Sequence, residues 1–207
     1  MMAARIRTLR EIKKEATAQI LAQKAFELAM ERGLAGFVIE DVVQRAGYSR
    51  RTFANYYSCK EEAVAMAVMS SYNYNKILDM IDDLPLDASP LEVMYQISQL
   101  KITKKLLLNL QQLIILSKKN PTLQPYVLKV LDEAQVTIKK ILDFLFNDRY
   151  STKYTRILAR VVCAAIFSLV DDTMNELVPG QEPRDLLNEL SYHKYIDNVF
   201  EYLRDGF

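Results

Sequence analysis

Residues 46–57 contain the side chains with the most distinctive chemistry in this chain of 207 residues. Gly47 is suited to end one helix in the left-handed backbone conformation, and Ser49 is suited to cap the next helix through its hydroxyl. At helical spacing, Phe53 and Tyr57 face inward. The outward-facing side chains are polar and able to contact bases and phosphates: Arg50, Arg51, Thr52, Asn55 and Tyr56. This pattern is typical of a DNA-binding helix-turn-helix.

Three helices are predicted to hold this segment. The first begins near residue 9 or 13 and ends at Arg32, because Gly33 follows a run of apolar residues spaced by three and four. The second covers about 39–46, and the third covers about 49–57. The buried stripe predicted for the first helix consists of Ile20, Leu21, Ala25, Leu28 and Ala29.

A fourth helix is predicted to begin at Ser58 and to continue to about Asp82. Ser58 is a favourable cap, and Glu61 and Glu62 place negative charge near the positive end of the helix dipole. An uninterrupted helix of this length joins two parts of the chain. It is therefore expected to transmit a tilt of its far end to the recognition helix.

The remainder of the chain is predicted to be helical as well. Only 5 Gly and 6 Pro occur, and most of them lie between apolar stretches of helical period. We therefore predict an all-α protein with an N-terminal three-helix DNA-binding domain at 1–62 and a second helical domain at 63–207. The helices predicted in the second domain are Pro90–Leu100, Ile102–Lys119, Thr122–Phe146, Thr152–Leu177 and Arg184–Arg204.

The two predicted domains differ in charge. Residues 1–60 contain 11 Lys and Arg against 6 Asp and Glu, whereas 61–207 contain 16 against 20. The net charge of +1 for the whole chain therefore conceals a basic N-terminal segment. Contact with DNA phosphates requires such a segment, although ordinary solvated surfaces reach the same charge.

The composition argues against a membrane protein or a secreted one. Uncharged stretches such as 106–117 and 161–170 are shorter than the roughly 20 residues of a membrane-spanning helix. The N-terminus lacks the apolar run of a secretory signal, and Cys59 and Cys163 are far apart in the sequence. We expect no membrane partner and a cytoplasmic location, associated with the nucleoid.

No catalytic, cofactor or metal site is predicted, and we expect that the protein is not an enzyme. His193 is the one histidine and has no cysteine or acidic pair at metal-ligand spacing, and no glycine-rich phosphate loop occurs. Asp172 and Glu176 are four residues apart and share one helix face. A solvated surface or an ion pair explains these two carboxylates more simply than catalysis does.

Several short motifs between residues 9 and 64 follow one another at a characteristic spacing. They are Thr17 with Ile20-Leu21, Glu31-Arg32-Gly33, Ile39-Glu40-Asp41-Val42, Ala46-Gly47-Tyr48-Ser49, Thr52-Phe53, Tyr56-Tyr57 and Lys60-Glu61. In this combination they resemble the DNA-binding domain of the TetR family of bacterial transcriptional regulators. The resemblance covers a little over a quarter of the chain.

The resemblance implies that some outward-facing residues contact bases and others contact phosphates. Arg50, Arg51 and Asn55 are expected to face bases in the major groove, because Arg offers two donors to guanine and Asn pairs in a bidentate manner with adenine. Thr52, Tyr56 and Lys60 are expected to contact phosphates. The complete predicted DNA-binding set is Ser49, Arg50, Arg51, Thr52, Asn55, Tyr56 and Lys60.

One departure from the family pattern concerns the start of the second helix. Thr is frequent there in the family, whereas this chain has Phe37 and Val38. Neither side chain is able to cap a helix or donate a hydroxyl to a phosphate. One backbone contact usual in the family is therefore in doubt.

The resemblance also implies the role of the second domain. It is expected to form a homodimer through a four-helix bundle made by the last two long helices of each subunit, and to bind a small hydrophobic or amphipathic effector. Small residues such as Ala159, Ala164 and Ala165 allow close helix packing, although a core within one subunit has the same pattern. Two-fold symmetry matches a palindromic operator in double-stranded DNA.

These expectations combine into one hypothesis and two alternatives. The first is a homodimeric repressor that a small ligand releases from its operator. The second is a DNA-binding protein of the same fold that acts through a protein partner, or organises DNA, without a small ligand. The third, an enzyme or carrier that has lost operator binding, leaves Arg50, Arg51 and Asn55 without a purpose. The sequence does not separate the first two.

Overall fold

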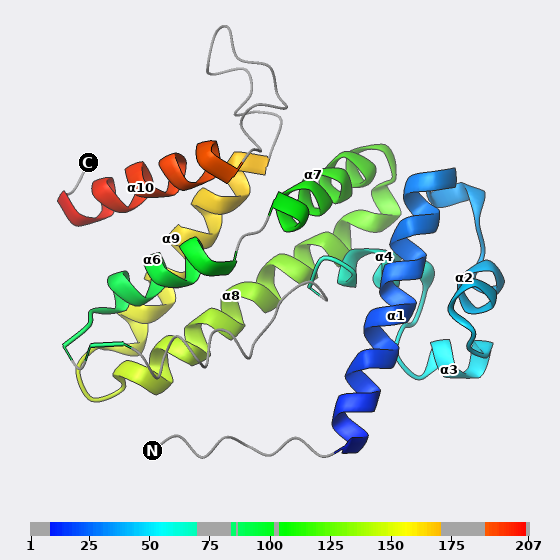
Figure 1. The fold of residues 1–207 in the computed structure, drawn as a ribbon, viewed down its shortest axis with the longest axis horizontal. Coiled ribbons are helices and arrows are strands. Elements are labelled where there is room, and N and C mark those ends of the chain that lie inside the picture. Colours follow the sequence, from blue (N-terminus) through cyan, green and yellow to red (C-terminus); the bar gives the residue numbers. More distant parts are fainter. Residues whose placement is uncertain (1–8, 70–83, 86, 102–103, 171–188, 206–207) are drawn as a thin grey trace, which may run out of the picture. The chain divides into compact units, whose positions relative to one another are not determined.

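The computed structural model describes residues 9–69, 84–85, 87–101, 104–170 and 189–205 (Figure 1). Every regular element in these ranges is helical, which confirms the predicted all-α fold. The α-helices are α1 (Leu9–Arg32), α2 (Ile39–Ala46), α3 (Arg50–Ala54), α4 (Lys60–Met66), α6 (Pro90–Lys101), α7 (Lys104–Lys119), α8 (Gln124–Phe146), α9 (Thr152–Val170) and α10 (Glu189–Asp205). Short 3-10 helices, η1 (Leu34–Gly36) and η3 (Pro121–Leu123), precede α2 and α8.

Most predicted helices are confirmed. α1 begins at the earlier of the two predicted positions, and α2 has the predicted bounds. α6, α7 and α8 correspond to the three helices predicted between residues 90 and 146. α9 and α10 lie where the last two helices were predicted, while residues 171–188 lie outside the described part of the chain.

The third and fourth helices are shorter than predicted. α3 ends at Ala54, because the N–H of Asn55 is shared between the carbonyls of Arg51 and Thr52 and the chain then turns. α4 ends at Met66, where the N–H groups of the next two residues bond to carbonyls three residues back. The prediction of one uninterrupted helix to Asp82 is therefore wrong at this point, and residues 70–82 lie outside the described ranges.

The chain folds into two compact units. The first contains Met1–Ser70 together with Leu116–Val127, and the second contains Ser71–Ile115 together with Leu128–Phe207. In the first unit, α1 packs against η1, α2 and α4, and α4 also contacts η3. In the second, α6 packs against α9 and α10. The functional boundary expected near residue 62 remains a prediction.

The core of the first unit is built around α1. Four of the five residues in the predicted α1 stripe are buried, but Ile20 is 41% exposed. Phe37, predicted only as a poor cap, is 2% exposed and belongs to this core. Buried residues of the unit outside α1 include Leu34, Val42, Val43, Phe53, Ala63, Val64 and Leu123.

The core of the second unit combines apolar packing with a few buried hydroxyls. The Tyr192 hydroxyl of α10 donates to the Ser98 carbonyl of α6 at 3.0 Å, and the Ser98 hydroxyl donates to the Met94 carbonyl. Between α8 and α9, the Thr155 hydroxyl donates to the Asp143 carboxylate. Buried apolar residues of α9 and α10 include Leu158, Ala159, Val162, Cys163, Leu169, Val170, Ile196 and Phe200.

Candidate nucleic-acid interface

The turn between α2 and α3 depends on the backbone freedom of one glycine. Gly47 has φ 73° and ψ 29°, the left-handed conformation that side chains with a Cβ disfavour. The Gly47 N–H donates to the Gln44 carbonyl, and the Tyr48 N–H donates to the Val43 carbonyl at 2.9 Å. The last carbonyls of α2 are thereby satisfied, as in a Schellman motif. The chain then reverses directly into α3.

α3 begins at the predicted cap. The Ser49 side chain accepts a hydrogen bond from the Thr52 N–H at 3.1 Å, and the two hydroxyls of these residues lie 2.9 Å apart. The cap compensates an unpaired donor at the start of a helix of only five residues. Both hydroxyls predicted for DNA contact are therefore also partners of each other.

Two aromatic residues anchor the inner side of α3. Phe53 is 1% exposed, and its ring centroid lies 5.7 Å from that of Tyr57. The Tyr57 hydroxyl donates to the Ala18 carbonyl of α1 at 2.9 Å. Burial raises the pKa of Tyr57 to about 12, since the charged phenolate is poorly solvated there. The predicted inward orientation of both residues is confirmed.

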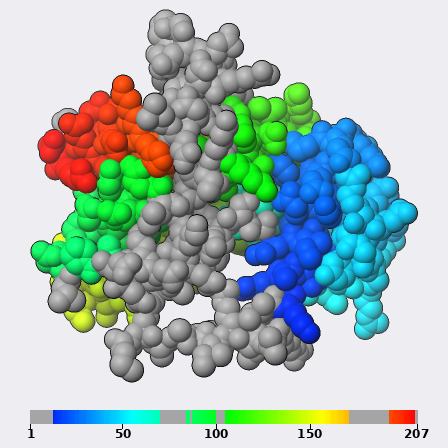
Figure 2. Space-filling view, viewed as in Figure 1, coloured from blue at the N-terminus to red at the C-terminus, as the bar shows by residue number. Residues whose placement is uncertain are grey.

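The opposite side of α3 is exposed. Arg50, Arg51, Ala54 and Asn55 are exposed, and Tyr56 is half-buried. Figure 2 shows the surface of α2 and α3, in light blue to cyan, beside the darker blue of α1. Arg51 makes no ion pair or hydrogen bond through its side chain with any described residue, so its five donors face solvent.

Arg50 differs from Arg51 because it already has a partner. Its Nη1 atom lies 2.7 Å from Oε1 of Glu40, in the first turn of α2. The two side chains are 73% and 55% exposed, so the ion pair lies at the surface. No local sequence rule pairs residues ten positions apart across a turn, and the sequence alone therefore missed Glu40.

Lys60 is also engaged within the protein. Its Nζ donates to the carbonyls of Leu34 at 2.6 Å and Phe37 at 2.7 Å, and it lies 4.9 Å from the centroid of the Phe37 ring. These contacts tie the segment before α2 to the first residue of α4. The predicted phosphate contact of Lys60 remains a prediction, to be made with the third N–H of the ammonium group.

The N-terminus of α2 has only one half of a capping box. Val38 is its N-cap, with extended backbone and a side chain that makes no capping hydrogen bond. The Val38 N–H donates to the Asp41 carboxylate at 2.8 Å, which is the reverse half of a capping box. The absence of a side-chain cap, predicted from the valine, is thus an observed feature of this helix.

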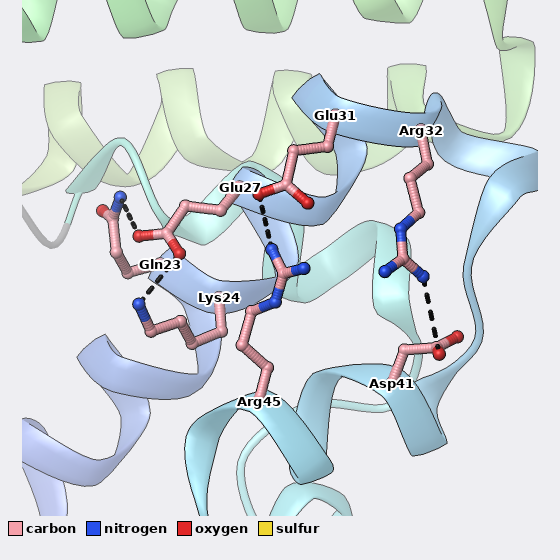
Figure 3. A network of polar contacts seen from close by, with 7 residues as sticks. All are labelled: Gln23, Lys24, Glu27, Glu31, Arg32, Asp41 and Arg45. Atoms are coloured by element: carbon pink, nitrogen blue, oxygen red, sulfur yellow. Dashed lines mark hydrogen bonds and ion pairs between the residues drawn. The ribbon is translucent and has the colours of Figure 1, made fainter.

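Two ion pairs join α1 and α2 (Figure 3). Arg45 of α2 contacts Glu31 of α1 at 2.6 Å, and Arg32 of α1 lies 3.7 Å from Asp41 of α2. The hydrogen bond from Arg45 lowers the pKa of Glu31. Each pair lies near the surface, so it contributes little to the stability of the fold.

The junction between α3 and α4 differs from the predicted Ser58 cap. Cys59 is the N-cap, and its Sγ accepts from the Glu62 N–H at 3.4 Å. The N–H and hydroxyl of Ser58 both donate to the Glu62 carboxylate at 2.8 Å. A hydrogen bond with the Cys59 thiol raises the pKa of Tyr126 near the start of α8. The cap thus lies one residue later than predicted, and the Ser58 hydroxyl donates to the Glu62 carboxylate.

None of the described helices combines the length and apolar character needed to cross a membrane.

The chain was compared with known proteins and structures. It matches no protein-family model and no curated protein sequence. A solved transcriptional regulator from Rhodococcus sp. Rha1 is similar over 91% of this chain and 96% of its own, with 17% identity and a TM-score of 0.52. A TetR/AcrR family regulator from Thermobifida fusca YX-ER1 shows 15% identity over 93% of this chain and 98% of its own, with a TM-score of 0.42. The chain therefore shares its fold with the Rhodococcus regulator.

Proposed function

We propose that the protein is a transcriptional regulator of the TetR type that binds double-stranded DNA in a sequence-specific manner. The observation that carries this proposal is the exposed side of α3 and its C-cap, where Arg51 and Asn55 face outward while Phe53 and Tyr57 anchor the inner side. A short, firmly held helix with polar side chains on one face is what the major groove accepts.

The exposed residues divide by the chemistry they offer. Arg51 and Arg50 are proposed to contact guanine, and Asn55 to contact adenine. Thr52, Tyr56 and Lys60 are proposed to contact phosphates, which set position without carrying sequence information. Ser49 contributes mainly as the cap that holds the first turn of α3, through its bond with the Thr52 N–H.

The proposed regulator acts as a homodimer on a palindromic operator, because one short helix per subunit contacts too few bases for specificity. Support comes from α9, where Ile157 is 60% exposed and Val161 is 39% exposed, and Ala164 is exposed on the same face. A second copy of this chain covers such a stripe.

Release by a small hydrophobic or amphipathic effector completes the proposal. A ligand that binds the second unit better in one conformation shifts the protein toward that conformation, and DNA affinity falls if the spacing of the two recognition helices changes with it. Since α4 ends at Met66, the transmission does not run through one uninterrupted helix.

The experiment is a selection of binding sites with the purified full-length protein. Duplexes recovered from a random library are sequenced and then tested by fluorescence anisotropy at several salt concentrations. The proposal expects a palindromic consensus and an affinity that falls steeply with salt. Recovery of duplexes without any common sequence contradicts it, and dependence of binding on an added protein supports the alternative without a small ligand.

A further inference from the structure

The starting observation is the ion pair between Glu40 and Arg50. The carboxylate of Glu40 in α2 lies 2.7 Å from the guanidinium of Arg50, the first residue of α3. Arg50 belongs to the proposed base-contacting set, and Glu40 shares its exposed surface. A carboxylate thus lies where DNA phosphates are expected to approach, an arrangement that opposes non-specific attraction to DNA.

The ion pair is not needed to hold α2 and α3 together. Both side chains are more than half exposed, and pairs of this kind contribute little to stability. The Gly47 turn, the Ser49 cap and the buried Phe53 ring already determine the position of α3. The placement of a negative charge on this surface therefore calls for a reason other than folding.

We propose that Glu40 is a positioning residue for Arg50 that raises the sequence specificity of DNA binding. It holds the guanidinium for contact with a base and opposes contact of the same guanidinium with a phosphate. This inference rests on the proposed DNA-binding function.

The geometry allows Arg50 to serve both partners. The guanidinium has five N–H donors, and the contact with Glu40 is made through Nη1. A bidentate contact with guanine takes two donors, so enough remain while the Glu40 contact persists. Restraining the long side chain before binding reduces the entropy lost when it meets the base.

Contact with a phosphate is a different case. A phosphate that approaches Arg50 also approaches the Glu40 carboxylate, and the two negative charges repel each other. A guanine edge is uncharged and meets no such repulsion. Glu40 therefore weakens binding to all sequences alike, and the base contact of Arg50 compensates only on the correct sequence.

The test uses Glu40→Gln in the full-length protein. Dissociation constants are measured on a duplex selected with the parent protein and on a shuffled duplex of the same length and composition. The expected result is tighter binding to the shuffled duplex, with the ratio of specific to non-specific affinity lower by roughly tenfold. Thermal unfolding of the variant is expected to match that of the parent.

Glu61→Gln is the matched control. It removes the same charge from the first turn of α4, where Glu61 forms no ion pair with any described residue. The control is expected to keep the affinity ratio of the parent. An unchanged ratio in Glu40→Gln, or an equal change in both variants, overturns the inference.

A double-mutant cycle identifies the route through Arg50. Arg50→Ala is expected to weaken specific binding by roughly 5- to 150-fold in the parent and by several-fold less in Glu40→Gln. Equal losses in the two backgrounds contradict a positioning role. If the parent protein selects no DNA sequence, the proposed DNA-binding function is wrong. If the parent is sequence-specific and Glu40→Gln has the same ratio of specific to non-specific affinity, only the role of Glu40 is wrong.

Discussion

The basic side chains around α3 differ in whether they already have an interaction partner within the protein. Arg45 contacts Glu31, Arg50 contacts Glu40, and Lys60 donates to two backbone carbonyls. Among the four basic residues of 39–60, Arg51 alone has no such partner in the described parts of the chain. Arg51 therefore offers its whole guanidinium to DNA, and its side chain tests the proposed base contact without any change to an interaction within the described parts of the protein.

Arg51→Ala is expected to weaken binding to the selected duplex by about 1–3 kcal/mol, because a bidentate contact with a base is lost. Arg51→Lys is the matched variant: it keeps the charge but not the planar pair of donors. Anisotropy titrations should show that lysine restores binding to a shuffled duplex but not the preference for the selected one. Full recovery of specificity by lysine assigns Arg51 to a phosphate instead.

Tyr57→Phe is expected to destabilise the protein by about 1 kcal/mol, because the Ala18 carbonyl loses its donor. The effect depends on pH. The unfolded chain ionises near the ordinary tyrosine pKa of 10.0, whereas folding raises the pKa of Tyr57 to about 12. This contribution is therefore complete below pH 10 and is lost as the pH rises toward 12.

Urea unfolding of parent and Tyr57→Phe across this pH range provides the measurement. The difference in free energy of unfolding should shrink as the pH rises, and comparison with the parent removes the contributions of other tyrosines. Tyr56→Phe serves as the control, since it removes the neighbouring phenol. A difference that stays constant to pH 12 would mean that the Tyr57 hydroxyl is not protected by folding.

At the scale of elements, the helices of the first unit differ in how their N-termini are satisfied. Ser49 caps α3 through its hydroxyl and Cys59 caps α4 through its thiol, whereas α2 starts at Val38 without a side-chain acceptor. Asp41 accepts the Val38 N–H and supplies negative charge to the first turn. α2 is therefore the helix whose start is open to improvement.

Val38→Ser is expected to stabilise the protein by about 0.5–1 kcal/mol, because it completes the capping box with Asp41. Little apolar contact is lost, since Val38 is 54% exposed and its backbone already has the extended conformation of a cap. Val38→Ala is the control, because it shortens the side chain without adding an acceptor. Chemical denaturation in which serine is no more stable than alanine argues against the observed cap geometry.

At the scale of the whole molecule, α9 has two different faces. Ala159, Val162 and Cys163 are buried within a single chain, so they are not available to a second subunit. Ile157, Val161 and Ala164 form a separate, exposed stripe at spacings of four and three. The proposed homodimer therefore requires this outer stripe, which contains Ala164 but not the buried Ala159.

Ile157→Asp is expected to raise the dissociation constant of the dimer roughly 100-fold, because a charge without a partner enters the contact. Analytical ultracentrifugation at micromolar concentration measures the shift. Leu128→Asp is the control: Leu128 is 65% exposed on α8, next to the exposed polar residues Lys129 and Gln124. A parent protein that is monomeric on and off DNA refutes the proposed interface.

The features that the sequence predicted correctly are those set by residues close to one another along the chain. The bounds of α2, the Ser49 cap and the inward rings of Phe53 and Tyr57 depend on neighbours within a few residues, and all were predicted. The exposure of Ile20, in a stripe of correct helical period, depends on which helices surround α1. Periodicity identifies an apolar face but does not measure its width.

The sequence by itself determined the all-α fold, the glycine turn and the outward-facing residues of α3, because helix period, capping and turn chemistry are local. Only the tertiary structure decided which of those residues are already engaged. Glu40 reaches Arg50 across a turn, and Lys60 reaches carbonyls more than twenty residues earlier in the chain. Such partners meet because the packing of helices brings together residues that are distant along the chain. Spacing in the sequence alone does not predict which of these residues lie close in space.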